Sequence, residues 1–455
     1  MPIDWTEYDL PRSDSTWGRL AFRLEHRLLS PGTSDIGRLR GYLRMKEWRA
    51  CSSARERLFT LKVAAKLPAR AVRESRQAVA RYGDAVAREA GVSRRRQLLQ
   101  LWWLRVRHGV HPSNYYAFRL YGPGQLRRAP SFLQDYEPTK MFRLLHRYTA
   151  PEEADLLLDK ERFEQWLVDH GFPTTRTIMS FAGGTVTRSS LPQGELPRHD
   201  IFAKPNDFLQ GFHTHRWTYD GQGWTGMDGR RRDAQALRAE LGALSSMREL
   251  LIQERLRNHP ALAALAPGAL STVRVLTLRG EDGVVRVVLA VCKIPVGSAP
   301  TDHMRLGGLA APVDLATGRL GPAIGKSETA IVQPCERHPD TGAVLEGFAL
   351  PHWEGVMRLA VRVHEALDRI VCVGWDIAIL EDGPVVIEGN DNPGHTSSQL
   401  PTGIALGETP VISTMLSRLR ASFDAPPPNG RRTTRRDADR DREMVRGAPA
   451  VTPRS

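Results

Sequence analysis

The 455-residue chain has few cysteines and no long apolar run. Its four cysteines, Cys51, Cys292, Cys335 and Cys372, form no Cys-x-x-Cys pair, which argues against structural zinc or a disulfide framework and predicts reduced thiols. No stretch approaches the roughly 20 apolar residues of a membrane-spanning helix, and mean hydropathy is −0.37. The first 20 residues lack the apolar segment of a secretory signal. We therefore expect a cytoplasmic protein.

The excess of positive charge lies in two segments. The net charge is +13, and residues 41–108 contain 17 Lys and Arg against 5 Asp and Glu, whereas the last 31 residues contain 8 Arg against 4 acids. The rest of the chain is slightly acidic. No nucleic-acid-binding motif accompanies this charge, so we expect no specific nucleic-acid binding. Two readings of the first basic segment stay open: an ordinary solvated face of a helical domain, or a docking surface for anionic membrane.

Periodicity and composition divide the chain into three parts. Apolar residues recur at helical spacing through Leu58 and Leu61 and through Leu98 and Leu101, which predicts a basic helical region over 1–140. Residues 141–424 mix helices with β-type runs separated by turns, which predicts an α+β body. The tail, 425–455, has almost no apolar residues and is predicted to be disordered. The expected strands cover 175–181, 200–204, 250–256, 272–279 and 284–294, and a helix is expected over 353–370.

A pair of strands near the end of the chain carries the strongest chemical signal. Residues 372–380 and 384–390 are joined by a Glu-Asp-Gly turn, which predicts an antiparallel hairpin. Glu388 and Asn390 are two apart and therefore project from one face, where Asp376 of the partner strand can join them. Carboxylate and amide oxygens suit Mg²⁺ bound to nucleotide phosphates. The alternative is a polar strand end at Asp376 and a solvated edge at Glu388.

Several motifs together are similar to the sugar-transfer-associated ATP-grasp proteins, which are related to α-L-glutamate ligases. The similarity covers residues 98–407, and it rests on the following motifs: Pro-Gly-Ala-Leu-Ser-Thr-Val-Arg-Val at 267–275, Gly-Gly-Leu-Ala-Ala-Pro-Val-Asp at 307–314, His-Pro-Asp-Thr-Gly at 338–342, Leu-Pro-His-Trp at 350–353, Gly-Trp-Asp at 374–376 and Glu-x-Asn at 388–390. The resemblance implies an α+β ATP-grasp fold, with two lobes, 141–250 and 251–424, sandwiching a nucleotide after a helical N-terminal region.

The resemblance also implies roles for single residues and implies ATP and Mg²⁺ as cofactors. The lysines that reach the phosphates would be Lys160 and Lys204, and the strand that holds adenine and ribose would carry Gln253 and Glu254. Arg274 and Lys293 would neutralise phosphate charge in the transition state. At the sequence level a solvated Lys160 and an edge acid at Glu254 stay open as alternatives.

Two departures from the family pattern stand out. Lysine occupies position 293, where the family more often has arginine, so the bidentate geometry of a guanidinium is lost. Residues 206–216 contain one glycine, although ATP-grasp ligases usually cover the phosphates with a glycine-rich loop. His213 and His215 of this segment are interpreted as surface histidines.

The resemblance implies an ATP- and Mg²⁺-dependent carboxylate–amine or carboxylate–alcohol ligase that acts through an acyl phosphate. Such chemistry needs no nucleophilic side chain, in agreement with the absence of a Gly-x-Ser-x-Gly elbow. The family's association with sugar transfer implies a small-molecule or glycan-linked substrate in polysaccharide or sugar-conjugate biosynthesis. Two alternatives remain: a kinase on the same fold, and a nucleotide-binding scaffold with reduced or no turnover.

Overall fold

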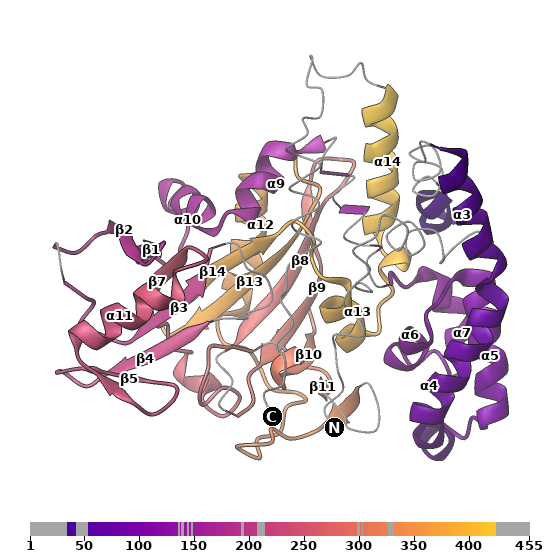
Figure 1. The fold of residues 1–455 in the computed structure, drawn as a ribbon, viewed down its shortest axis with the longest axis horizontal. Helices are drawn as coiled ribbons and strands as arrows, with labels where there is room; N and C mark the ends of the chain where they lie inside the picture. Colours follow the sequence, from indigo (N-terminus) through magenta and orange to yellow (C-terminus); the bar gives the residue numbers. More distant parts are fainter. Residues whose placement is uncertain are drawn as a thin grey trace.

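A computed structural model describes residues 34–41, 53–134, 137, 141–142, 145–146, 149–192, 195–206, 214–297, 301–302, 304–325 and 332–424. Two antiparallel sheets of seven strands each form the body, and a group of helices lies beyond the second sheet (Figure 1). Cys51, His213, most of the glycine-poor segment and the tail 425–455 lie outside the described residues. Cys292, Cys335 and Cys372 are free thiols. No helix among the described residues is long and apolar enough to cross a bilayer.

The described part of the basic N-terminal region is helical, as its periodicity predicts. Local signals set its boundaries: Ser93 accepts a hydrogen bond from the Arg96 amide at the start of one helix, and Gly91 and Gly109 end two helices in the left-handed conformation, at φ 66° and 68°. The helices are α3 (Ala54–Ala65), α4 (Leu67–Ala90), α5 (Arg94–His108), α6 (Pro112–Ala117) and α7 (Gln125–Arg128).

The first sheet has the strand order β2-β1-β7-β3-β4-β5-β6. Its elements are α9 (Pro151–Leu158), α10 (Lys160–Asp169), β1 (Thr177–Ala182), β2 (Thr185–Ser189), β3 (Ile201–Pro205), β4 (His215–Tyr219), β5 (Trp224–Gly226), β6 (Arg231–Arg232), α11 (Ala234–Leu244) and β7 (Leu250–Glu254). Strand β7 pairs with both β1 and β3. The predicted lobe boundary at residue 250 therefore needs correction, because β7 is a central strand of this sheet and cannot belong to the next lobe.

The second sheet has the strand order β12-β11-β10-β9-β8-β13-β14. Its strands and the helices that follow or cover it are β8 (Thr272–Arg279), β9 (Val285–Ile294), β10 (Leu309–Val313), β11 (Ala323–Gly325), β12 (Gln333–Cys335), α12 (Trp353–Glu365), β13 (Cys372–Leu380), β14 (Gly383–Asn390), α13 (His395–Thr402) and α14 (Pro410–Asp424). The predicted strands 272–279 and 284–294 and the hairpin 372–390 are present. The helix predicted over 353–370 ends earlier, at Glu365.

The two faces of the second sheet have different neighbours. Helix α12 covers one face, where Val356 and Val363 pack with Val273 and Val373. Helix α14 covers the other face, where Ile412 and Met415 pack with residues that include Leu276 and Leu289. Arg274 is two residues from Leu276 on β8, so its side chain lies on the α14 face, toward the end of the strand.

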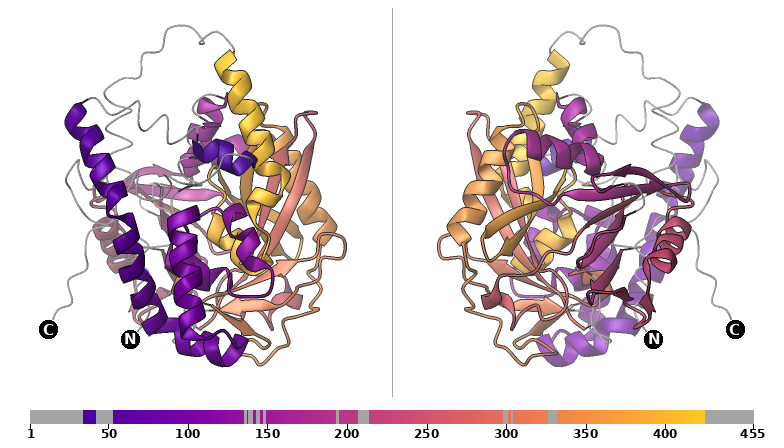
Figure 2. Two further views of the ribbon diagram at one scale, coloured as in Figure 1. Left: turned by 90° about the vertical axis from the view of Figure 1, so that its right-hand side faces the viewer. Right: turned by 90° about the vertical axis from the view of Figure 1, so that its left-hand side faces the viewer.

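The helical region joins the core of the second lobe. Ile36 and Leu39 share a hydrophobic core with α14, and Ala405, just after α13, packs into the core of α4–α6. Seen from its two ends, the molecule presents the helical region on one side and the first sheet on the other, with the second sheet between them (Figure 2).

Candidate active site

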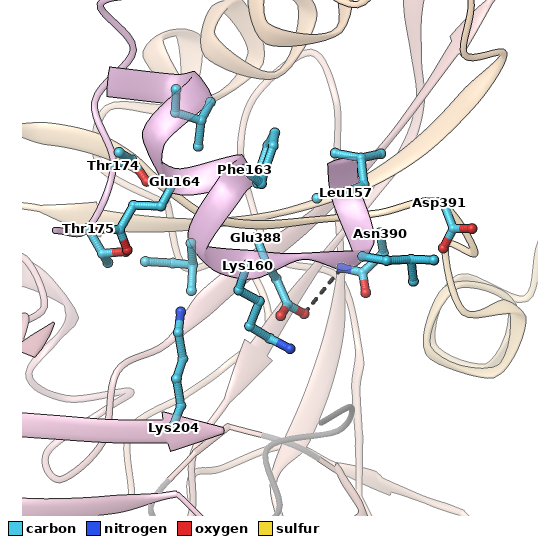
Figure 3. A pocket seen from close by; sticks show the side chains of 14 residues that line it. Leu157, Lys160, Phe163, Glu164, Thr174, Thr175, Lys204, Glu388, Asn390 and Asp391 are labelled. Carbon is cyan, nitrogen blue, oxygen red and sulfur yellow. Dashed lines mark hydrogen bonds between the residues drawn. The ribbon is translucent and has the colours of Figure 1, made fainter. Parts of the chain in front are cut away.

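A pocket lies between helices α9–α10, strand β3 and the end of strand β14 (Figure 3). Helices α9 and α10 supply apolar side chains together with Lys160 and Glu164, and the remaining elements supply mainly polar side chains. The lining residues are Leu157, Leu158, Lys160, Phe163, Glu164, Leu167, Thr174, Thr175, Lys204, Ile387, Glu388, Gly389, Asn390 and Asp391. Four residues predicted from the sequence to bind nucleotide or metal are among them.

Two lysines reach this pocket from different elements. Lys160 opens α10 behind the N-cap Asp159, and its Nζ donates to the Asn206 carbonyl at 3.1 Å. Lys204 is on β3 and extends toward α10 (Figure 3). Burial, and then the charge of Lys160, lower the pKa of Lys204 to about 8, although Glu388 and Glu164 oppose this shift. Two ammonium groups held close together favour an anionic ligand, which would relieve their repulsion.

Glu388 and Asn390 line the opposite side of the pocket. They are two residues apart on β14, and the Asn390 Nδ2 donates to Glu388 Oε1 and to the Gly374 carbonyl, both at 3.2 Å. Both bonds use the amide nitrogen, so Oδ1 is the atom that Asn390 can offer to a cation. The same-face placement predicted from the sequence is therefore present.

Asp376, Arg274 and Lys293 form a buried ion cluster beside these residues. Antiparallel register places Asp376 between Glu388 on β14 and Arg274 on β8. Arg274 binds Asp376 through two nitrogens, Nε to Oδ1 at 2.6 Å and Nη2 to Oδ2 at 2.9 Å, and the Lys293 Nζ is 2.8 Å from Oδ1.

Charge balance keeps this cluster ionised. Burial opposes the carboxylate, but Arg274 and Lys293 outweigh it and hold the pKa of Asp376 below its usual range. Burial also opposes the charge of Arg274, and Asp376 outweighs it and raises the pKa of that guanidinium. The anionic partner of these two buried cations is therefore Asp376.

The three predicted magnesium ligands are neighbours, but only two of them line the pocket. Within the described residues, no three His, Cys, Asp or Glu side chains are grouped closely enough to hold a metal ion. Glu388 and Asn390 face the pocket, whereas the oxygens of Asp376 accept from Arg274 and Lys293. This donor set fits Mg²⁺, which usually takes one or two carboxylates and completes its shell with water and phosphate oxygens. Direct ligation by Asp376 stays a prediction.

Gln253 and Glu254 lie apart from the pocket lining. The Gln253 side chain is buried and donates to Glu164 Oε2 at 2.7 Å and to Thr175 Oγ1 at 3.1 Å, so it ties β7 to α10. Glu254 ends β7 with its side chain exposed. Their predicted roles toward adenine and ribose are not tested by this geometry.

Sequence reasoning missed three acidic residues of this region. Glu164 lines the pocket four residues after Lys160, a spacing that places both on one helix face. Asp391 directly follows Asn390 and also lines the pocket, and the buried His146 lies behind it at 3.7 Å. Asp302 accepts from the Thr272 amide at 2.7 Å and from its hydroxyl at 2.6 Å. No local pattern singles out Asp302, because it lies in a loop whose role depends on distant strands.

The family profile for sugar-transfer-associated ATP-grasp proteins matches residues 140–411. The chain belongs to this family. The fold and the resemblance predicted from the sequence are thus confirmed. A search of curated proteins finds no match.

Among solved structures, this ATP-grasp protein is similar to D-alanine–D-alanine ligase from Bacillus anthracis, at 15% identity and a TM-score of 0.35 over 59% of this chain and 69% of that chain. It is also similar to D-alanyl-alanine synthetase A from Vibrio cholerae, at 12% identity and a TM-score of 0.36 over 61% of this chain and 68% of the other.

Proposed function

We propose that this protein is an ATP- and Mg²⁺-dependent ligase that joins a carboxylate to an amine or an alcohol through an acyl phosphate. The observation that carries the proposal is the meeting, in one pocket, of two lysines from the first lobe with a carboxylate and an amide from the second. Cations opposite oxygen donors are the arrangement that a metal-bound polyphosphate requires.

The residues of the site have two kinds of role: some would bind ATP and Mg²⁺, and others hold a charged side chain in a fixed position. Lys160 and Lys204 bind phosphate oxygens of ATP, while Glu388 and Asn390 are the groups that would hold Mg²⁺, which neutralises phosphate charge when bound. Arg274 and Lys293 keep Asp376 ionised next to Glu388, so two carboxyl groups on β14 and β13 stand beside two cations on β8 and β9. Fixed charges of this kind stabilise a phosphoryl transition state without reorganising.

The proposed reaction has two steps. A substrate carboxylate oxygen attacks the γ-phosphorus, the bond to the β-phosphate oxygen breaks, and ADP leaves with that electron pair. An amine nitrogen or a hydroxyl oxygen of the second substrate then attacks the acyl carbon, loses its proton and expels inorganic phosphate. The family's association with sugar transfer supports a glycan-linked or small-molecule acceptor in polysaccharide or sugar-conjugate biosynthesis.

The test is a screen for ADP formation over carboxylates combined with activated sugars, amino acids and polyamines. Ligation requires both substrates for ADP release and leaves γ-labelled phosphate free in solution. Label retained in the product would show that the protein is a kinase rather than a ligase. ATP binding without turnover would indicate a nucleotide-binding scaffold. Lys204→Met should abolish ADP release, whereas Arg230→Met, at an exposed turn of the first sheet, serves as the matched control.

A further inference from the structure

The outward face of α5 presents apolar and basic side chains together. Leu99, Trp102 and Trp103 are 70%, 41% and 45% exposed, and Arg95, Arg96 and Arg107 on the same helix are also exposed. Positions 95, 99, 102 and 103 follow the helical repeat and therefore share one face. We name these six residues, Arg95, Arg96, Leu99, Trp102, Trp103 and Arg107, the α5 patch.

The inner face of α5 fixes this orientation. Leu101 and Leu104 are buried in the core that α4 and α6 share with α5. Gln97 donates through Nε2 to the carbonyls of Gly83 at 2.9 Å and Val92 at 2.7 Å, and the buried Arg105 binds Glu74. A rotation that hid the tryptophans would break these bonds and expose the leucines. The α5 patch is therefore a fixed surface of the folded protein.

Exposed apolar side chains are concentrated in this region. Of the thirteen large hydrophobic side chains that are exposed among the described residues, six belong to α3, α4 and α5: Leu58, Leu61, Val72, Leu99, Trp102 and Trp103. Within α5, Leu99, Trp102 and Trp103 share one helix face. Grouped exposed apolar side chains of this kind mark an interaction surface, whereas single ones carry no such meaning.

The charge of this surface indicates the kind of partner that it binds. Helix α5 contains five arginines and no Asp or Glu. Two of the three acids on α4 are already matched, because Glu74 binds Arg70 and Arg105 and Asp84 binds Arg94. The surface therefore pairs a cationic field with tryptophan and leucine, the combination by which peripheral helices bind anionic lipid headgroups and place apolar rings at the boundary with the acyl chains.

We infer that the α5 patch docks this protein on an anionic membrane surface. Helix α5 lies at the end of the molecule away from the first sheet (Figures 1 and 2), and none of the patch residues lines the active-site pocket. Docking therefore leaves the nucleotide pocket unobstructed, and this inference does not depend on the proposed function.

The test is co-sedimentation of the full chain with vesicles of equal parts phosphatidylglycerol and phosphatidylcholine, at low and at high salt. Binding should occur at low salt and weaken at high salt, because the Debye length shrinks. Arg95→Glu with Arg96→Glu should weaken binding about tenfold or more, since each basic residue near such a surface contributes about 1 kcal/mol. Trp102→Ala with Trp103→Ala should weaken it as well.

Arg230→Glu with Arg358→Glu is the matched control, because it changes the net charge equally at exposed sites elsewhere and should bind like the parent. Absence of binding at low salt would overturn the inference, and so would equal binding at both salts, equal binding to pure phosphatidylcholine, or an equal loss in the control. If the protein self-associates without vesicles and the tryptophan variant abolishes this, the partner of the α5 patch is a second copy of the chain. If it binds RNA and not vesicles, the partner is nucleic acid.

Discussion

At the scale of single residues, the protonation state of Lys204 should make ATP affinity depend on pH. Burial and Lys160 lower its pKa to about 8, so its ammonium is charged at neutral pH and loses its proton as pH rises through that value. Because ATP is an anion, its affinity should fall over this range from about pH 7 to 9. Lys204→Arg stays charged and should flatten the profile. Calorimetric titration of ATP across this range is the measurement, and an equally steep fall in the arginine variant would contradict the assignment.

Glu388 is the residue on which the metal prediction depends most directly. Glu388→Gln keeps the side chain's size and removes the charge that Mg²⁺ requires, so the gain in ATP affinity on adding Mg²⁺ should disappear. The measurement compares ATP binding with and without Mg²⁺ in parent and variant. Glu381→Gln, on the exposed turn of the same hairpin, is the control and should keep the gain. A full Mg²⁺ effect in Glu388→Gln would remove this residue from the metal site.

At the scale of elements, Gly389 allows α9 and β13 to pack against β14. A Cβ at this position would lie 2.6 Å from Trp375 Cζ3 and 2.8 Å from Leu157 Cδ2. Gly389→Ala should therefore push the α9 wall outward, lower the free energy of unfolding by about 1–3 kcal/mol and weaken ATP binding. Gly268→Ala is a suitable control, because its nearest neighbour would be 3.4 Å away. An unchanged melting temperature and ATP affinity in Gly389→Ala would show that α9 moves without loss of stability, and would contradict this prediction.

Elements with a strong local pattern were predictable, and their partners in space were not. The two strand-like runs 372–380 and 384–390 and the turn between them predicted the hairpin. The pairing of Asp376 with Glu388 depends in addition on a register shift between Asp376 and Ile377, which the local pattern did not show. The spacing could not show that Arg274 and Lys293 would both bind Asp376, because three strands must first assemble. It likewise missed that Gln253 binds Glu164, since that contact joins a strand to a helix 89 positions earlier.

At the scale of the whole molecule, the basic helical region is part of the fold. Ile36 and Leu39 pack with α14, and the buried Gln399 side chain exchanges hydrogen bonds with the Leu133 backbone, at 3.1 Å and 2.9 Å. Arg128 also binds Glu408 across 280 positions of sequence. The division into a helical region and two lobes therefore describes composition better than it describes independent folding units.

A chain that lacks residues 1–140 should fail to form a stable monomer, because its removal exposes the α14 face and the apolar surface around Ala405. We expect the full chain to unfold in one cooperative transition when circular dichroism and tryptophan fluorescence are followed together. Removal of 425–455, the tail that composition predicts to lack a core, is the control and should leave the transition unchanged. A soluble fragment 141–455 with its own cooperative melt would show that the ATP-grasp lobes fold alone. In that case the shared cores would contribute docking between preformed units rather than stability of the whole.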